Sequence, residues 1–365
     1  MDKEYISPQQ CMLLLAGFGV GTSVLLIPTI LIQHAQQAAL ISIALAFIPG
    51  IVLVSMLSSL NKWYPGQSLV QYSVSILGLP GKLIGLLFIW YALHSSTLVL
   101  RDMGIFINIT MLAQTPTTVI YLLVVGVSAF GIVMGLETIS RSLALLVFLA
   151  CLISGLLLFF TLPYGDFQNM LPILGNNDWS GIVTACFILS SFPVGEFILF
   201  GMLIFNIKGA KQVIISLIQG QIIAAIIGIT VFIQVITVLG VARASHSIMA
   251  IVSVLNAIPS SNLLLIPFSL TWFIFTIVKF FICYYAFIVG FAHWTGIDDY
   301  RPLVLPGGAL IIGITIVLFE GVGEHQNYNQ LYGPIYSTPI EYGIPLLLWL
   351  AAGLKILIPG SGRRP

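Results

Sequence analysis

Long apolar runs separated by short polar connections make up most of this chain. A helix that crosses the hydrocarbon core of a bilayer, about 30 Å thick, needs roughly 20 apolar residues. The pattern therefore predicts an all-α polytopic membrane protein with ten transmembrane helices: residues 8–32, 38–60, 81–112, 117–137, 141–163, 180–205, 211–240, 265–294, 302–319 and 338–358. Two amphipathic pieces, residues 67–77 and 247–258, are too short to cross and are expected at the interface or as re-entrant segments.

The basic residues of the loops predict the orientation of these spans. When the N-terminus is placed in the cytoplasm, the cytoplasmic segments collect ten Lys and Arg residues, and the outer loops collect only Arg243. An excess of basic residues marks cytoplasmic loops. We therefore expect both termini to be cytoplasmic. The first span lacks a preceding basic region, so we expect it to remain as a helix and not to act as a cleaved signal peptide.

The first span contains three closely spaced glycines, Gly17, Gly19 and Gly21. Glycine disfavours a continuous helix, and a broken helix in a bilayer is tolerated only where its freed backbone groups line a cavity or meet a ligand. This interpretation predicts a binding site. The alternative is that Gly17 and Gly21 form a GxxxG face for close helix packing, with no break at all.

The sixth span contains a second interruption, in which Pro193 and Gly195 follow Ser190 and Ser191. Proline removes a helical hydrogen bond and clashes with the preceding turn. The loop after residue 163 divides the chain into two five-helix halves, residues 8–163 and 180–358, which an odd helix number would place as an inverted repeat. Breaks at corresponding positions of two halves point to a transporter-type site, and this correspondence favours a break in the first span.

Two broken helices offer both polarities that a zwitterionic ligand needs. Free N–H groups near the first break suit a carboxylate, and free carbonyls at residues 190–193 suit an ammonium group. An aromatic side chain, Phe18 or Phe192, is placed to cover the ligand. The predicted ligand-binding residues are Gly17, Gly19, Gly21, Thr22, Ser23, Ser190, Ser191, Phe192, Gly195 and Glu196.

Lys279 lies near the middle of the eighth span, where a charge requires a cavity or a partner. Three roles are open: its ammonium bonds the freed carbonyls of the first span in place of a coupling sodium ion, it binds a proton or the ligand, or it forms a structural ion pair. Glu196, the interior acid of the sixth span, is predicted to pair with Lys279 or Arg101, or to carry a proton.

Arg101 shares one face of the third span with Tyr91, His94 and Leu98. It either finds an acidic partner or extends outward to the membrane surface. Asp102 points about 100° away from Arg101 on a helix and is the less favoured partner.

The amino-acid composition and the absence of known motifs argue against several classes of function. The chain is 59% hydrophobic and 7% charged, whereas soluble domains carry about 25% charged residues. Its net charge of +1 gives no reason to expect a nucleic-acid partner. The four cysteines are far apart, with no C-x-x-C pair, so we expect neither a metal site nor a disulfide framework. With no nucleophile elbow, phosphate loop or zinc motif, we expect no cofactor and no enzyme activity.

Three motifs resemble a known family: the run from Gly19 to Pro28 (GVGTSVLLIP), residues 169–175 (NMLPILG) and Ser191 to Glu196 (SFPVGE). They resemble the B subunits of bacterial spore germinant receptors, members of the amino acid, polyamine and organocation transporter superfamily. The resemblance implies a LeuT-type fold with a 5+5 inverted repeat and discontinuous helices 1 and 6. It also implies a place in the spore inner membrane, a small germinant such as an amino acid, and two partners, an A subunit and a C-subunit lipoprotein. Gly21, Thr22 and residues 192–196 match the family's site positions.

Two other functions fit the same pattern. Lys279 and Glu196, as titratable interior groups, suit a proton-coupled amino acid permease. A structural or ion-conducting membrane component needs no small-molecule site and predicts that Gly21→Leu leaves function intact.

Overall fold

The computed structural model describes residues 5–174, 179–207, 210–259 and 261–357. Within these ranges the chain is helical, and the one β-pairing is an isolated parallel bridge between Ile6 and Ile207. Eight helical stretches of the described chain are long and apolar enough to cross a membrane. The protein is an all-α, multi-pass membrane protein, as the hydropathy pattern predicted.

The first half of the chain forms seven α-helices. They are α1 (Pro8–Val20), α2 (Ser23–Ala35), α3 (Ala39–Trp63), α4 (Leu69–Leu77), α5 (Leu79–Thr110), α6 (Thr117–Met134) and α7 (Leu136–Thr161). The short helix α4 corresponds to the amphipathic piece expected at residues 67–77. A capping box starts it, with Ser68 bonded to the Gln71 backbone and Gln71 bonded back to Ser68.

The second half begins with a span built of three helical types. It comprises α8 (Trp179–Leu189), the π-helical turn η4 (Ser190–Val194) and the 3₁₀ helix η5 (Gly195–Met202). The helices that follow are α9 (Ala210–Ser245), α10 (Ala250–Ala257), α11 (Ser261–Thr295), α12 (Arg301–Val317), α13 (Val322–Asn327), α14 (Gly333–Thr338) and α15 (Ile344–Leu357). Two π-helical turns, η7 (Tyr328–Tyr332) and η8 (Pro339–Gly343), connect α13, α14 and α15.

The first span is broken where its glycines predicted. Helix α1 ends at Val20, Gly21 leaves the helical region with φ −11° and ψ −115°, and α2 begins at Ser23. The glycines also allow close packing: a Cβ atom on Gly17 would lie 2.8 Å from the Val147 side chain. The predicted break is confirmed, and the alternative of an unbroken helix with a GxxxG face is wrong, although Gly17 does pack closely within the broken segment.

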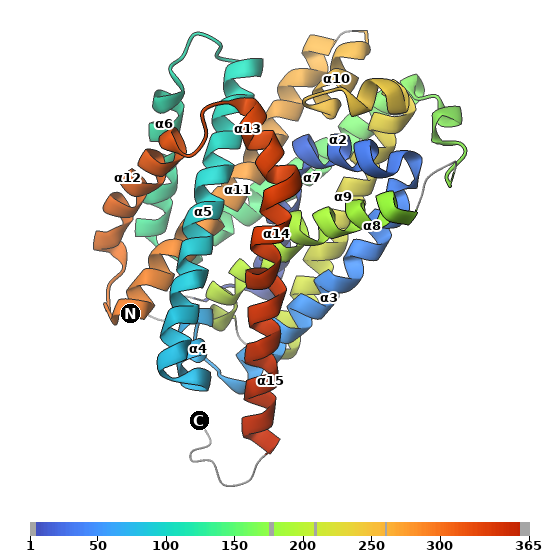
Figure 1. The fold of residues 1–365 in the computed structure, drawn as a ribbon. Coiled ribbons are helices and arrows are strands. Elements are labelled where there is room, and N and C mark those ends of the chain that lie inside the picture. The colour runs from blue at the N-terminus through green and yellow to red at the C-terminus, as the bar shows by residue number, and fades with distance from the viewer. Residues whose placement is uncertain (1–4, 175–178, 208–209, 260, 358–365) are drawn as a thin grey trace.

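The sixth span is also broken where predicted. Phe192, which precedes Pro193, has the non-helical angles φ −118° and ψ 116° between α8 and η5. The residue before a proline is biased away from the helical region, which explains the position of the break. Figure 1 shows α8 entering the bundle toward its centre, next to α14.

The tenth span differs from its prediction. We expected a loop up to residue 337 and a helix over 338–358, but the helical stretch begins at Val322 and continues to Leu357. Polar residues such as His325 lower the hydropathy of its first part, yet His325 is buried inside the bundle. Figure 1 shows α13, α14 and α15 following one another along the length of the bundle, in front of α5. The expected ninth span is the shorter apolar helix α12.

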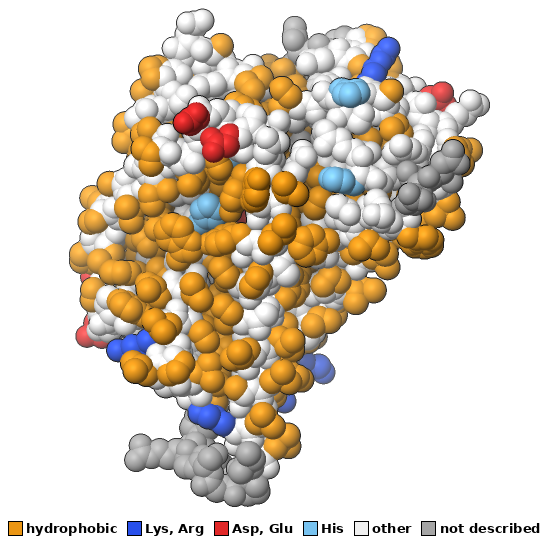
Figure 2. All heavy atoms as spheres, in the orientation of Figure 1, with side chains coloured by type: hydrophobic (Ala, Val, Ile, Leu, Met, Phe, Trp, Pro, Cys, Tyr) orange, Lys and Arg blue, Asp and Glu red, His pale blue; other side chains and the backbone are white. Residues whose placement is uncertain are grey.

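Helix α11 lies at the centre of the fold, and 89% of its apolar window is buried. It packs against α1, α5 and α7, so a charge in its middle has no route to the surface. The outer surface is apolar: hydrophobic side chains cover the middle of the face seen in Figure 2, and most visible Lys and Arg side chains lie toward the end that holds α4 and the last turn of α15.

Candidate functional site

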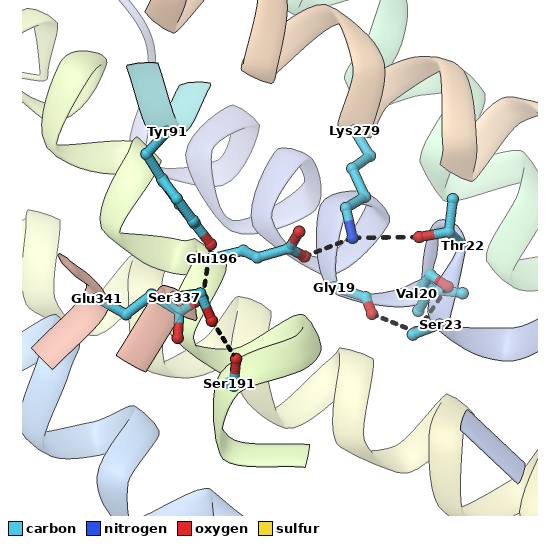
Figure 3. Close-up of polar contacts among 10 residues, drawn as sticks. All are labelled: Gly19, Val20, Thr22, Ser23, Tyr91, Ser191, Glu196, Lys279, Ser337 and Glu341. Carbon is cyan, nitrogen blue, oxygen red and sulfur yellow. Dashed lines mark hydrogen bonds and ion pairs between the residues drawn. The ribbon is translucent and has the colours of Figure 1, made fainter. Parts of the chain in front are cut away.

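Lys279 connects the two broken helices. The Lys279 side chain is fully buried on α11, and its Nζ donates to Glu196 Oε2 at 2.5 Å and to Thr22 Oγ1 at 3.2 Å (Figure 3). The same Nζ lies 4.3 Å from the ring centroid of Phe192 and 5.3 Å from that of Phe18. The ion pair between Lys279 and Glu196 was one of the predicted pairings. At the first break the ammonium meets the Thr22 hydroxyl, where we had expected a backbone carbonyl.

The freed carbonyls of the first break are satisfied by the chain itself. Ser23 Oγ donates to the carbonyls of Gly19, at 2.6 Å, and Val20, at 2.9 Å. The Gly21 amide donates to the Gly17 carbonyl at 2.9 Å. The expectation that the Gly21 amide is open to a ligand carboxylate is therefore wrong for this conformation, because Gly17 already holds that donor. The hydroxyl of Thr22 and the ammonium of Lys279 are the polar groups left facing the sixth span.

The sixth break is covered by the tenth span. The Tyr342 hydroxyl donates to the Ser190 carbonyl at 2.6 Å, and the Gly195 amide donates to the Ser191 carbonyl. The hydroxyls of Ser191 and Ser337 are 2.5 Å apart. Two of the carbonyls that we expected to accept a ligand ammonium, those of Ser190 and Ser191, thus already have donors. The carbonyls of Ser190 and Ser191 therefore each have one hydrogen bond already, and an ammonium group entering here would be a second donor to them.

Glu341 is a buried carboxylate that the sequence reasoning passed over. It lies on η8 and is 1% exposed, and the Tyr91 hydroxyl donates to its Oε1 at 2.5 Å. A Cβ atom on Gly195 would overlap the Glu341 carboxylate, which explains why glycine is needed after the break. An acidic residue within the predicted span 338–358 was itself a signal, because interior charges are rare in membrane helices.

A small cavity lies between α5, the sixth break and α14. Its volume is about 40 Å³, which holds a few water molecules but not an amino acid. In this conformation the space beside Glu341 is too small for an amino acid. The cavity is lined by Tyr91, His94, Ser95, Leu98, Ser191, Phe192, Glu196, Tyr328, Asn329, Gly333, Pro334, Tyr336, Ser337 and Glu341.

Arg101 does not join this cluster. Its guanidinium donates to three backbone carbonyls at the end of α12, those of Thr315 at 3.2 Å, Phe319 at 3.0 Å and Gly321 at 3.4 Å. It also lies 5.3 Å from the ring centroid of Phe319. The expected alternatives, an acidic partner such as Glu196 or an outward extension, are replaced by a helix-end contact. Cations favour the carboxyl end of a helix, where unpaired carbonyls gather.

Asp102, the less favoured partner in the sequence, forms the second buried charged contact of α5. Its Oδ1 is 2.7 Å from His325 Nε2, and both residues are buried. His325 had been expected in a loop. The contact forms because Asp102 points toward α13, whereas Arg101 points toward the end of α12. A small pocket lined by Thr22, Asp102 and His325 places this contact beside the first break.

Residues 5–320 match the family described as spore germination protein. The chain belongs to this family. Spore germination protein KB of Bacillus subtilis (strain 168) is 26% identical over 365 residues, which covers 97% of this chain and 96% of the relative. Spore germination protein YndE of the same organism is 24% identical over 173 residues, covering 47% of this chain and 48% of the relative.

Solved structures establish the fold. The crystal structure of MhsT in complex with L-phenylalanine superposes with a TM-score of 0.71 at 12% identity, covering 96% of this chain and all of that one. Mhp1, a nucleobase-cation-symport-1 family transporter in a closed conformation with bromovinylhydantoin bound, gives a TM-score of 0.66 at 12% identity, covering 95% of this chain and 78% of that one. The fold is LeuT-like. Family and fold together identify a membrane germinant receptor or permease.

Proposed function

We propose that this chain is the B-type subunit of a spore germinant receptor and binds an amino acid germinant between its two broken helices. The observation that carries the proposal is the bridge from Thr22 through Lys279 to Glu196. It joins the first break, α11 and the sixth break at one point. A ligand carboxylate that pairs with Lys279 competes with Glu196 for the ammonium, so ligand binding changes the contact that connects the two helices.

Competition between the ligand and Glu196 for Lys279 gives the subunit a way to signal that the ligand is bound. A ligand shifts a conformational equilibrium only by its differential affinity for the two states. The closed cavity favours the unliganded state, and the ligand favours a state in which the Lys279 and Glu196 contact is rearranged. We infer that the resulting movement of η5 and α14 is passed to an A subunit and a C-subunit lipoprotein.

The orientation proposed from the loop charges places both termini in the cytoplasm. Lys62 in the last turn of α3 and Lys355 in the last turn of α15 lie at one end of the bundle, whereas Arg243 lies in the last turn of α9. We place the receptor in the inner membrane of the spore, with the α4 end facing the interior. Cysteine accessibility at Lys62→Cys and Arg243→Cys tests this placement, because only one of the two sites should react with an impermeant reagent.

Spore germination tests the function directly. Spores that lack the gene should fail to respond to at least one amino acid, and the wild-type gene should restore that response. A complementing gene with Lys279→Gln should not restore it. Normal germination of the deletion strain with every nutrient would show that the chain is not a germinant receptor.

A second function, a proton-coupled amino acid permease, is favoured by one observation. Lys279 and Glu196 form a buried pair of titratable groups at the junction of the helices that move in this fold. Uptake of amino acids into proteoliposomes driven by a proton gradient would support transport. A protein that binds an amino acid but shows no such uptake would be a sensor only.

A further inference from the structure

One buried acid of the bundle, Glu341, has no cation beside it among the described residues. Lys279 and Glu196 neutralise each other, and His325 lies against Asp102. Glu341 forms no ion pair with any residue of the described chain. A carboxylate buried without a cation is costly in a low-dielectric interior, so it either carries a proton or awaits a positively charged partner.

The polar groups around the Glu341 carboxyl group suit the binding of a charged ligand group. Tyr91 donates to Oε1, whereas Oε2 accepts no well-formed hydrogen bond from the described residues. The hydroxyls of Ser191 and Ser337 lie beside the carboxyl group. Figure 3 shows Tyr91, Ser337 and Glu341 gathered on the side of Glu196 that is away from Thr22. Glu341 lines the small cavity, whereas its Oε2 is buried against Gly195, so expansion of the cavity has to expose this oxygen before a ligand can reach it.

We propose that Glu341 is the anchor for the ammonium group of a small amine-bearing ligand. The proposal rests on the proposed function in that this ligand is the germinant. Without ligand the carboxyl group keeps a proton. When the ligand enters, the proton leaves to solvent, and the N–H groups of the ligand ammonium donate to the ionised carboxylate. No bond other than this O–H bond is broken. The ligand ammonium balances the charge of the ionised Glu341, and the carboxylate of a zwitterionic amino acid leaves the whole cavity one charge more negative, beside the Lys279 ammonium.

The lining of the cavity favours an ammonium group over a metal ion. Five aromatic side chains contribute to its walls: Tyr91, His94, Phe192, Tyr328 and Tyr336. Aromatic faces attract organic cations. Sodium or calcium needs about six oxygen ligands, which the few hydroxyls beside Glu341 do not supply. An ionised carboxylate at this position is a stronger acceptor for an ammonium group than the carbonyls of Ser190 and Ser191, which already accept one hydrogen bond each. A ligand with its carboxylate at Lys279 and its ammonium at Glu341 bridges the sixth break.

Titratable groups on the helices packed around Glu341 contribute to the electrostatic potential at its carboxyl group. They are Tyr91 and His94 on α5, Cys186 on α8, Glu196 on η5, Lys279 and Cys283 on α11, Tyr328 and Tyr336 on the η7 and α14 segment, and Tyr342 on η8 itself. Glu196 is paired with Lys279, whereas Glu341 has no cation beside it among the described residues. Proton exchange during amine binding is therefore assigned to Glu341.

Movement of α14 provides the expansion that a ligand needs. This six-residue helix has a π-helical turn on each side, η7 before it and η8 after it. π-helical turns interrupt regular helix packing and occur frequently at functional sites. A shift of α14 enlarges the cavity without unfolding the spans on either side.

Calorimetry on the purified full-length chain in lipid nanodiscs tests the proposal. Each of the twenty common amino acids, its N-acetyl derivative and ethylammonium chloride is titrated in two buffers that differ in heat of protonation, with sodium chloride as the salt control. Glu341→Gln is compared with wild type and with Glu320→Gln, which removes an exposed acid with no role in the cavity. Tyr91→Phe is the second variant, since it keeps the carboxyl group and removes its hydroxyl donor.

The expected result is that wild type and Glu320→Gln bind an amine-bearing compound with a heat that depends on the buffer, because a proton is released. Glu341→Gln should bind at least about tenfold more weakly, as loss of a buried charge partner costs more than 1.4 kcal/mol. Tyr91→Phe should weaken binding less. If Glu341→Gln does not fold, unchanged affinity and unchanged proton release in Tyr91→Phe overturn the proposal.

Other outcomes separate this proposal from the receptor function. N-acetyl amino acids that bind as well as their parents, or Glu341→Gln with wild-type affinity, would overturn the role of Glu341 and leave the receptor function standing. Ethylammonium binding that depends on Glu341, without binding of any amino acid, would support the site and contradict the amino acid receptor. Equal heats for sodium and ethylammonium, or no binding of any amine, would overturn the ammonium site.

Discussion

Glu196 Oε2 lies 2.5 Å from Lys279 Nζ, and both side chains are buried where the two broken helices meet. Each residue alone is an expensive charge in the interior of a membrane protein. Together they form a contact that satisfies both charges and fixes the distance between η5 and α11. The pair is therefore a structural element of the closed state and, at the same time, the contact that a charged ligand must alter.

Breaking this pair on one side should be costly. Lys279→Met leaves the Glu196 carboxylate buried and unpaired, and removal of one partner of a buried pair destabilises by about 3–5 kcal/mol. Chemical denaturation in detergent micelles measures the loss. The double variant Lys279→Met with Glu196→Leu should recover much of it, since no buried charge remains.

An exposed ion pair supplies the control. Arg141 and Glu137 are 2.6 Å apart on the first turns of α7, and their side chains are 68% and 39% exposed. Arg141→Gln should change the free energy of unfolding by less than about 1 kcal/mol. Equal effects of Lys279→Met and Arg141→Gln would contradict a structural role for the buried pair.

Gly195 should tolerate no side chain. A Cβ atom there overlaps the Glu341 carboxylate, so Gly195→Ala must move that carboxylate away from its contact with Tyr91. We expect a loss of about 1–3 kcal/mol in stability, as for other overpacked interiors, together with weaker ligand binding. Thermal melting of the nanodisc-embedded protein and calorimetry measure the two effects.

Gly126 on α6 is the matched position for this substitution. A Cβ atom at Gly126 meets no atom within 4 Å. Gly126→Ala should leave ligand binding unchanged and stability unchanged or slightly higher, because alanine favours the helix by roughly 1 kcal/mol over glycine. Similar losses in both variants would show that the Glu341 contact does not constrain Gly195.

Local chemistry explains which features of the site were predictable from the sequence. Glycines at residues 17–21 and Pro193 act on the backbone within a turn, so both breaks could be located without knowledge of the fold. Lys279 and Glu196 stand out because charges are rare in apolar runs. Their pairing was one of several alternatives, since Arg101 also offered a positive charge.

Features that depend on contacts between distant segments could not be predicted in the same way. Tyr91 and Glu341 are 250 residues apart in sequence, and Asp102 and His325 are 223 residues apart. Hydropathy placed His325 in a loop because the scale scores a polar residue as exposed. In the fold, its polarity is satisfied by Asp102 in the interior, so the helical stretch that begins at Val322 was missed.

Arg101 should affect stability without affecting the ligand. Its guanidinium bonds three carbonyls at the end of α12 and contacts no residue of the Lys279 cluster through a described hydrogen bond. Arg101→Met removes these donors and should cost about 1–3 kcal/mol, the range for buried acceptors left unsatisfied. Affinity for the ligand, measured at a temperature where the variant remains folded, should stay within about twofold of wild type, well inside the 1.4 kcal/mol of a tenfold change. A selective loss of affinity with unchanged melting would place Arg101 in the ligand site after all.

The hydroxyl of Thr22 should be the feature of the first break that matters for the ligand. Thr22→Val keeps the shape of the side chain but removes the group that accepts from Lys279 Nζ at 3.2 Å. The ammonium then loses a hydrogen bond, which costs about 1–3 kcal/mol when the buried donor finds no replacement. Thr22→Ser retains the hydroxyl and should retain both stability and ligand affinity. Thermal melting and calorimetry of the two variants, measured side by side, give the comparison. If serine and valine weaken the protein equally, the contact of Thr22 that matters is packing of its methyl group, and the bridge from the first break to Lys279 does not contribute to binding.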